Sequence, residues 1–232
     1  MEYGNLTVIG TSHIAKDSVS RVRETIVTGM PDIVAVELDH ARLHVMFSGE
    51  KPRFSLSMFR LMGLTGTLFF LIGSFLQKRL GKLIGTVPGE EMKTAVELAR
   101  QNGIRVALID QPFNITMGKI SGISLGEKLK LVRDMLLGIT GLEKGFDKEK
   151  IRIDLDLTKV PPESFVRMAM KKVKESYPEL YKVLVIDRDH YMANMLAKIM
   201  KMEPQSKVVA VVGAGHEKEI VNLVKKIINA KS

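Results

Sequence analysis

Four short apolar runs alternate with segments whose apolar residues recur at helical spacing, and this alternation constrains the fold more than any other feature of the chain. The apolar runs cover residues 6–9, 33–36, 104–109 and 208–212. The segments with a helical pattern cover residues 16–29, 88–102, 126–138, 161–173, 178–199 and 217–230. Strands that alternate with helices favour a mainly parallel sheet with helices on both of its faces. We therefore predict an α/β fold.

The length and composition predict one packed domain over residues 1–232. A chain of 232 residues can bury roughly 70% of the surface that its unfolded form exposes. Its 45% hydrophobic and 26% charged residues are ordinary for a globular protein, which argues against a disordered or fibrous one. Within this domain we expect a hydrophobic helical insertion at about 54–86 and a helical, charged insertion at about 126–178.

The first of these insertions contains a long stretch without charge. No charged residue occurs between Arg60 and Lys78, and the wider segment from Lys51 to Gly89 has six basic residues and no acid. A membrane-spanning helix needs about 20 apolar residues, and this stretch is short and contains glycines. We expect residues 61–77 to be buried against the core or a second subunit, which favours a homodimer. The alternatives are a helix that lies on a membrane surface and, less favoured, a membrane span.

Composition also restricts the partners and the compartment. The chain has no cysteine, so disulfides, thiolate metal ligands and a cysteine nucleophile are excluded. Its formal charge of +9 would attract anions, but the aromatic residues and modules typical of nucleic-acid binding are missing, so we expect no nucleic-acid partner. Residues 1–5 do not resemble a signal peptide. We expect a cytoplasmic protein, with peripheral attachment or anchoring at a membrane as the alternative.

The pattern Gly-x-x-His occurs at residues 10–13 and 213–216, each time directly after an apolar run. Parallel strands present their carboxyl ends along one edge of the sheet, so His13 and His216 can meet there. Glu37 follows the run at 33–36 and is expected at the same edge. The alternatives are that each histidine is a hydrogen-bonded loop residue and that Glu37 is an acid at a helix N-terminus.

A shared site of this kind has the residue types that a hydrolytic metal centre needs. His13, Glu37 and His216 could ligate a divalent ion, and Asp110 or Asp187 could add a ligand. Without thiolates, the expected metals are manganese, cobalt or zinc. Such an ion lowers the pKa of a water molecule, and one of the carboxylates or imidazoles would move its proton.

Other residues are candidates for binding or for structure. Arg42 and Arg188 could bind a substrate carboxylate or an oxyanion, because a guanidinium matches such groups. His40 and His44 are four residues apart on a predicted helix, but a solvated helix face is favoured for them, as it is for His190. The methionines lie at core spacing, and the glycines at 213–215 are a weak signal for phosphate binding.

Several blocks, taken together and in order, resemble the TraB/PrgY family. They are Gly-Thr-Ser-His-Ile-Ala-Lys-Asp-Ser-Val at 10–19, Val-Ala-Val-Glu-Leu-Asp at 34–39 with Arg42, Pro-Gly-Glu-Glu-Met at 88–92, Leu-Ile-Asp at 108–110 with Ile115-Thr116, Asp-Arg-Asp at 187–189 with Tyr-Met-Ala at 191–193, and Val-Val-Gly-Ala-Gly-His at 211–216. Members of this family include a bacterial inhibitor of a peptide sex pheromone and relatives of the Tiki metalloproteases. The resemblance covers nearly the whole chain.

The resemblance implies the same catalytic and metal-binding residues, His13, Glu37 and His216, with the family's paired arginines at Arg42 and Arg188. The family commonly has Asp-Arg where this chain has Asp110-Gln111, and Glu-Arg-Asp where it has Asp-Arg-Asp at 187–189. The first difference removes one cation that could bind substrate. Longer members have a hydrophobic carboxyl-terminal region that this sequence lacks, so the chain is either a short member or a trimmed one.

The pattern and the resemblance together predict a metal-dependent hydrolase, a peptidase, that acts on a peptide. The alternative is a non-enzymatic regulatory protein that sequesters a peptide or associates with a membrane.

Overall fold

A five-stranded sheet forms the centre of the protein, in a computed structural model that describes residues 1–11, 16–49, 89–140 and 163–230. The strands are β1 (Glu2–Tyr3), β2 (Leu6–Thr11), β3 (Ile33–Val36), β4 (Arg105–Leu108) and β5 (Val208–Gly213), in the order β1-β2-β5-β3-β4. β2, β5, β3 and β4 are parallel to their neighbours, and only β1 is antiparallel. This arrangement confirms the predicted α/β fold with a mainly parallel sheet.

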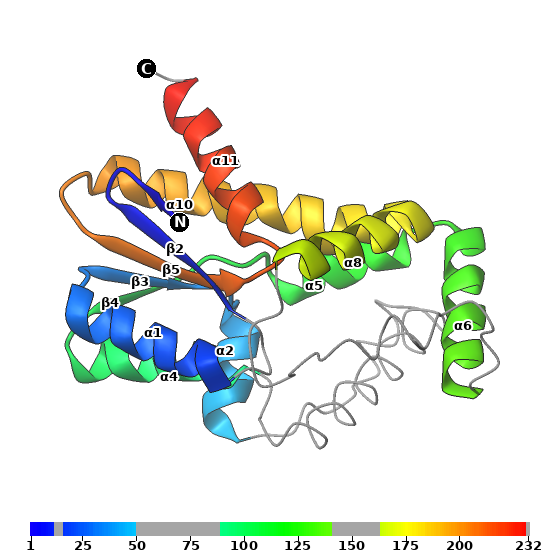
Figure 1. Ribbon diagram of the computed structural model, residues 1–232, viewed down its shortest axis with the longest axis horizontal. Coiled ribbons are helices and arrows are strands. Elements are labelled where there is room, and N and C mark those ends of the chain that lie inside the picture. Colours follow the sequence, from blue (N-terminus) through cyan, green and yellow to red (C-terminus); the bar gives the residue numbers. More distant parts are fainter. Residues whose placement is uncertain (12–15, 50–88, 141–162, 231–232) are drawn as a thin grey trace.

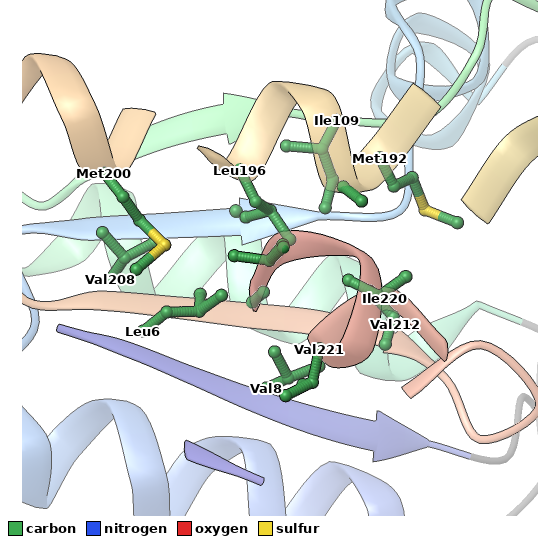
Figure 2. Close-up of a cluster of buried hydrophobic side chains, with 14 of the residues drawn as sticks. Leu6, Val8, Ile109, Met192, Leu196, Met200, Val208, Val212, Ile220 and Val221 are labelled. Carbon is green, nitrogen blue, oxygen red and sulfur yellow. The ribbon is translucent and has the colours of Figure 1, made fainter. Parts of the chain in front are cut away.

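Helices cover both faces of the sheet (Figure 1), as predicted. On one face α1 (Lys16–Gly29) and α4 (Glu90–Gln101) pack against the side chains of Ile9, Val34, Val36, Val209 and Val211. On the other face α10 (Asp187–Met202) and α11 (Glu217–Asn229) pack against the alternate residues of the same strands. Figure 2 shows this second cluster, in which Met192 and Leu196 of α10 lie with Ile220 of α11 beside Leu6 and Val212 of the strands. Because both faces are covered, β3 and β5 are continuous apolar runs, and β2 and β4 are mostly apolar.

The remaining described helices are α2, α5, α6, α8, α9 and a π-helix, η1. Their bounds are α2 (His40–Ser48), α5 (Phe113–Ser121), α6 (Leu125–Thr140), α8 (Glu163–Ser176), α9 (Pro178–Tyr181) and η1 (Lys182–Ile186). A small apolar cluster joins α5 to α9 and η1 through Met117, Ile120, Leu180 and Val183. η1 continues directly into α10, so the elements packed around α5 also set the position of the first turn of α10.

The two predicted insertions differ in how much of each is described. The uncharged stretch at 61–77 lies outside the described residues, as do residues 141–162 of the charged insertion. The rest of the charged insertion forms the helices α6 and α8 and the start of α9. Within the described ranges, no helix is long and apolar enough to cross a membrane.

Candidate functional site

Buried polar side chains of the described residues gather at one edge of the sheet. They are Thr11, Ser18, Glu37, Asp39, Glu91, Thr94, Asp110, Gln111, Thr116, Asp189 and His216. Each follows the carboxyl end of a strand or lies in the first two turns of a helix that begins at that edge. Burying polar groups is costly, so their concentration at the edge where α/β proteins bind ligands marks this edge as the candidate site.

Glu37 lies at the centre of this edge. Its backbone N–H donates to the carbonyl of Val211 at 3.0 Å. This hydrogen bond continues the pairing of β3 with β5 and holds the backbone of Glu37, and thus its Cα, in place. The carboxylate is buried, and its Oε2 accepts a hydrogen bond of 2.6 Å from the N–H of Gly213. Its Oε1 pairs with Nη2 of Arg188 and lies 3.8 Å from Nε2 of His216. The structure thus brings together the glutamate and the second Gly-x-x-His histidine.

His216 is held between two carboxylates. It follows β5 and precedes α11, and its Nδ1 lies 2.6 Å from Oδ1 of Asp189 in the first turn of α10. Burial by itself would lower the pKa of His216, but the hydrogen bond with Asp189 and the negative charge of Glu37 outweigh it and raise the pKa above its ordinary value. Asp189 was not among the site residues predicted from the sequence, although it stands directly after Arg188.

Arg188 joins two buried carboxylates. Its Nε donates to Oδ1 of Asp110 at 2.9 Å, and its Nη2 donates to Oδ2 of Asp110 at 2.8 Å and to Oε1 of Glu37. Nη1 donates to the carbonyl of Leu184 in η1 at 3.2 Å. Burial works against the charge of Arg188, but the charge of Glu37 and the hydrogen bonds to Asp110 outweigh it and raise the pKa of the guanidinium. Every nitrogen of Arg188 is therefore used within the protein.

Arg42 is the more accessible of the two predicted arginines. It lies in the first turn of α2, where Asp39 caps the helix by accepting from the N–H of Arg42 at 2.7 Å. Its Nη1 donates to Oδ2 of Asp110 at 2.9 Å, and 42% of the side chain is exposed, against 15% for Arg188. Arg42 is thus tied to the network at one nitrogen and otherwise faces the surface.

The other predicted site residues lie around this network or outside the described residues. His13 belongs to residues 12–15 and lies outside them. The carboxylate of Asp187 pairs with Lys119 at 2.6 Å, on the side of η1 and α5, and not with Glu37 or His216. Lys119 also donates to Oε1 of Gln111 at 3.2 Å, so a neighbouring lysine contacts the glutamine that replaces the family's arginine. His40, His44 and His190 are exposed, as expected of solvated helix positions.

The donors of Glu37 and His216 suit two ligands of one cation. Nε2 of His216 faces Oε1 of Glu37, and the hydrogen bond at Nδ1 is the second contact that metal-bound histidines usually make. Both oxygens of Glu37 are already engaged, Oε2 by the N–H of Gly213 and Oε1 by Arg188. Within the described ranges, no three side chains of suitable type come together as a metal site. His13, the third ligand predicted from the sequence, lies outside those ranges.

Formal charges at the site do not balance among the described residues of the network. Glu37, Asp110 and Asp189 carry three negative charges, while Arg42 and Arg188 carry two positive ones. With a neutral His216 the network has one negative charge in excess. A proton on the imidazole or a bound cation would balance this charge.

The fold and the site define an α/β domain with a charged centre of carboxylates, arginines and a histidine at the carboxyl edge of its sheet. The chain belongs to the TraB/PrgY/gumN family, whose sequence model matches residues 2–229. It is 34% identical over 230 residues to an uncharacterized protein of Methanocaldococcus jannaschii, a match that covers 97% of this chain and 54% of that protein. It is 26% identical over 234 residues to TraB domain-containing proteins of Bos taurus and Homo sapiens, matches that cover 90% of this chain.

The chain thus spans between 54% and 60% of the length of these relatives.

Proposed function

We propose that the chain is a metal-dependent hydrolase that cleaves peptides at the carboxyl edge of its sheet. The observation that carries the proposal is the buried pairing of Glu37 with His216, 3.8 Å apart, with the second imidazole nitrogen held by Asp189. His13, Glu37 and His216 would hold the ion, and manganese, cobalt or zinc suits these ligands. When bound, such an ion lowers the pKa of a water molecule toward neutrality.

The arginines would take different parts in this reaction. Arg188 would hold Glu37 in place, because its guanidinium is bound to the carboxylates of Glu37 and Asp110. Arg42 has exposed nitrogens beside the site and would bind a carboxylate of the peptide or its polarised carbonyl oxygen. A carboxylate or imidazole at this edge that does not hold the ion would move the proton to the leaving group.

Metal content is the first test of this function. The full chain, purified without a metal-binding tag, is analysed for elements beside a His13→Ala, His216→Ala double variant. We expect about one first-row metal ion per wild-type chain and none in the variant, because two imidazole ligands are lost. His40→Ala, His44→Ala is the matched control, because it removes two exposed histidines and should keep the metal. A wild type that stays empty when manganese, cobalt or zinc is added would contradict the proposal.

Peptide cleavage is the second test. A peptide library is incubated with the metal-loaded chain and with a Glu37→Gln variant, and the products are identified by mass spectrometry. We expect cleavage by the wild type, its loss on chelation and a loss of at least about 100-fold in the variant.

A non-enzymatic peptide-binding role is the second candidate function. It is favoured by the contacts of Glu37, whose carboxylate is bound to Arg188 and the N–H of Gly213 as a purely structural acid would be. This role predicts peptide affinity that survives both chelation and Glu37→Gln. Calorimetry with peptides from the same library separates the two functions.

A further inference from the structure

The buried acid Asp189 contacts the imidazole of His216. The Asp189 side chain is 3% exposed, and its Oδ1 lies 2.6 Å from Nδ1 of His216. A buried carboxylate needs a proton donor, and at this distance Nδ1–H is that donor. The tautomer of a neutral histidine is set by the hydrogen bond that one nitrogen makes. A proton on Nδ1 therefore leaves Nε2 bare, that is, unprotonated.

Two carboxylates compete for the single proton of a neutral His216, and their surroundings favour Asp189. Glu37 lies farther away, at 3.8 Å from Nε2, and its charge is already compensated by Arg188. Asp189 is closer by more than 1 Å and directs Oδ1 at the other nitrogen. The proton therefore belongs at Nδ1, and the bare Nε2 faces the carboxylate of Glu37.

The helix that begins at Asp187 places both partners at once. Arg188 and Asp189 are consecutive residues of its first turn, and the first contacts Glu37 while the second contacts His216. Nη1 of Arg188 also bonds the carbonyl of Leu184 in η1, which ties this turn to the π-helix before it. One helical turn thus fixes the carboxylate and the imidazole relative to each other.

We propose that Asp189 is a positioning residue, which holds His216 as the Nδ1-protonated tautomer with a bare Nε2 directed at Glu37. For its consequence in metal binding, this inference rests on the proposed function. A metal ion binds the unprotonated Nε2 of a histidine whose ring is correctly oriented. Loss of the side chain that holds the other ring nitrogen, here Asp189, typically weakens metal binding 10- to 100-fold.

The tautomer of His216 can be measured without metal or activity. The full chain is labelled with ¹⁵N, its metals are removed by chelation, and the imidazole nitrogens are observed by NMR at a pH that keeps the ring neutral. The signals of His216 are assigned from their loss in His216→Gln. In the wild type we expect Nδ1 protonated and Nε2 bare, and a proton on Nε2 would overturn the proposal.

Two variants then test whether Asp189 sets this state. Asp189→Ala removes both acceptor oxygens, so the ring proton is expected to move to Nε2, on the side of Glu37. Asp187→Ala is the matched control, since Asp187 lies two residues away and pairs with Lys119, and it should leave the tautomer unchanged. An unchanged tautomer in Asp189→Ala would also overturn the proposal. The wild-type spectrum decides the point if that variant does not fold.

Metal titration separates this inference from the proposed function. If the wild type binds a metal, Asp189→Ala is expected to bind it about 10- to 100-fold more weakly, and equal affinity would count against positioning. If the wild type binds no metal while the tautomer still depends on Asp189, the positioning stands and the metal-dependent function fails.

Discussion

At the scale of single residues, the site is a chain of buried charges that stabilise one another. Arg188 is its central member, since it bonds Glu37 and Asp110 together and has a largely buried side chain. Removing one partner of a buried ion pair leaves the other charge uncompensated, which costs far more than losing an exposed pair. Arg42 shares Asp110 with Arg188 but is much more exposed, so the two arginines make a matched comparison.

We expect Arg188→Ala to lower the free energy of unfolding by about 3–5 kcal/mol, because it leaves Glu37 and Asp110 buried without their shared cation. Arg42→Ala should cost about 1 kcal/mol or less, because Asp110 keeps its two bonds to Arg188. Urea unfolding of both variants measures the difference. Equal losses of unfolding free energy in the two variants would show that Arg188 stabilises the buried carboxylates no more than Arg42 does.

Gly10 opens the first Gly-x-x-His pattern, and close neighbours limit what can replace it. A Cβ at this position would lie 2.3 Å from Oε2 of Glu217 and 3.1 Å from the backbone Cα of Ala214. The glutamate can move away, but the backbone cannot easily do so. We expect Gly10→Ala to destabilise the protein by about 1–3 kcal/mol.

Gly29 is the control for that substitution, because a Cβ there meets nothing within 4 Å. Gly29→Ala lies at the end of α1 and should be neutral or stabilising by up to about 1 kcal/mol. Urea unfolding should therefore show a lower midpoint for Gly10→Ala than for wild type, and an unchanged or higher midpoint for Gly29→Ala. A Gly10→Ala variant as stable as wild type would contradict the close approach of Ala214.

At the scale of elements, two helices cap each other. The carboxylate of Glu127 in α6 accepts from the N–H groups of Glu179 and Leu180 at the start of α9, at 3.1 and 2.7 Å. In return, Oε2 of Glu179 accepts from the N–H of Ser124, just before α6, at 2.8 Å. Each helix thus satisfies the free N–H groups of the other. This exchange fixes α9 and, through η1, the helix that carries Arg188 and Asp189.

Glu127→Ala is expected to cost about 1–2 kcal/mol, the usual loss for a helix cap, because two backbone donors lose their acceptor. Hydrogen exchange of the Leu180 amide should speed up in the same variant. Glu24→Ala, an exposed glutamate of α1, is the control and should have little effect on either measurement. Unchanged exchange at Leu180 would mean that the cap is not formed in solution.

The same scale shows which elements the sequence predicts and which it does not. The strands and the helices that cover them are predicted because their apolar periodicity is long and regular. β1 and α5 are not predicted, since β1 has only two residues and α5 depends on a distant partner. η1 lies inside the helix predicted at 178–199, but the apolar pattern does not distinguish a π-helix from an α-helix. β1 pairs with β2 through a tight turn at Gly4, whose φ is 57°. Asp39, from beyond β3, accepts from the N–H of Phe113 at the start of α5, and the carbonyls of η1 follow a five-residue hydrogen-bond spacing.

At the scale of the whole molecule, a few ion pairs connect segments far apart in the chain. Arg105 at the start of β4 forms two hydrogen bonds to the carboxylate of Glu203, which follows α10. The hydrogen bonds from Arg105 and Ser206 lower the pKa of Glu203 in the folded protein. A group whose pKa is lowered by folding stabilises the protein above its unfolded pKa of about 4.3, and the contribution is lost as the pH falls through the folded value.

We therefore expect the stability to decline as the pH falls below about 4.5, and Glu203→Gln to make this decline shallower, because the variant has no carboxylate to protonate there. Thermal unfolding between pH 3 and pH 7 measures both effects. Glu24→Gln serves as the control and should follow the wild-type curve. A Glu203→Gln curve parallel to the wild type across this range would argue against the pairing with Arg105.

The sequence by itself determined the α/β class, four of the five strands, the family and the meeting of Glu37, Asp110 and His216 at one edge. It could do so because the carboxyl ends of parallel strands necessarily lie together, whatever the details of packing. Only the tertiary structure decided which of these charges contact each other. In the folded protein, Arg188 pairs with Glu37 and Asp110, while Arg42 lies near the surface. Asp187 pairs with Lys119, and Asp189 contacts His216. Such choices depend on the rotation of α10 about its axis, which distant packing fixes and which no local sequence pattern encodes.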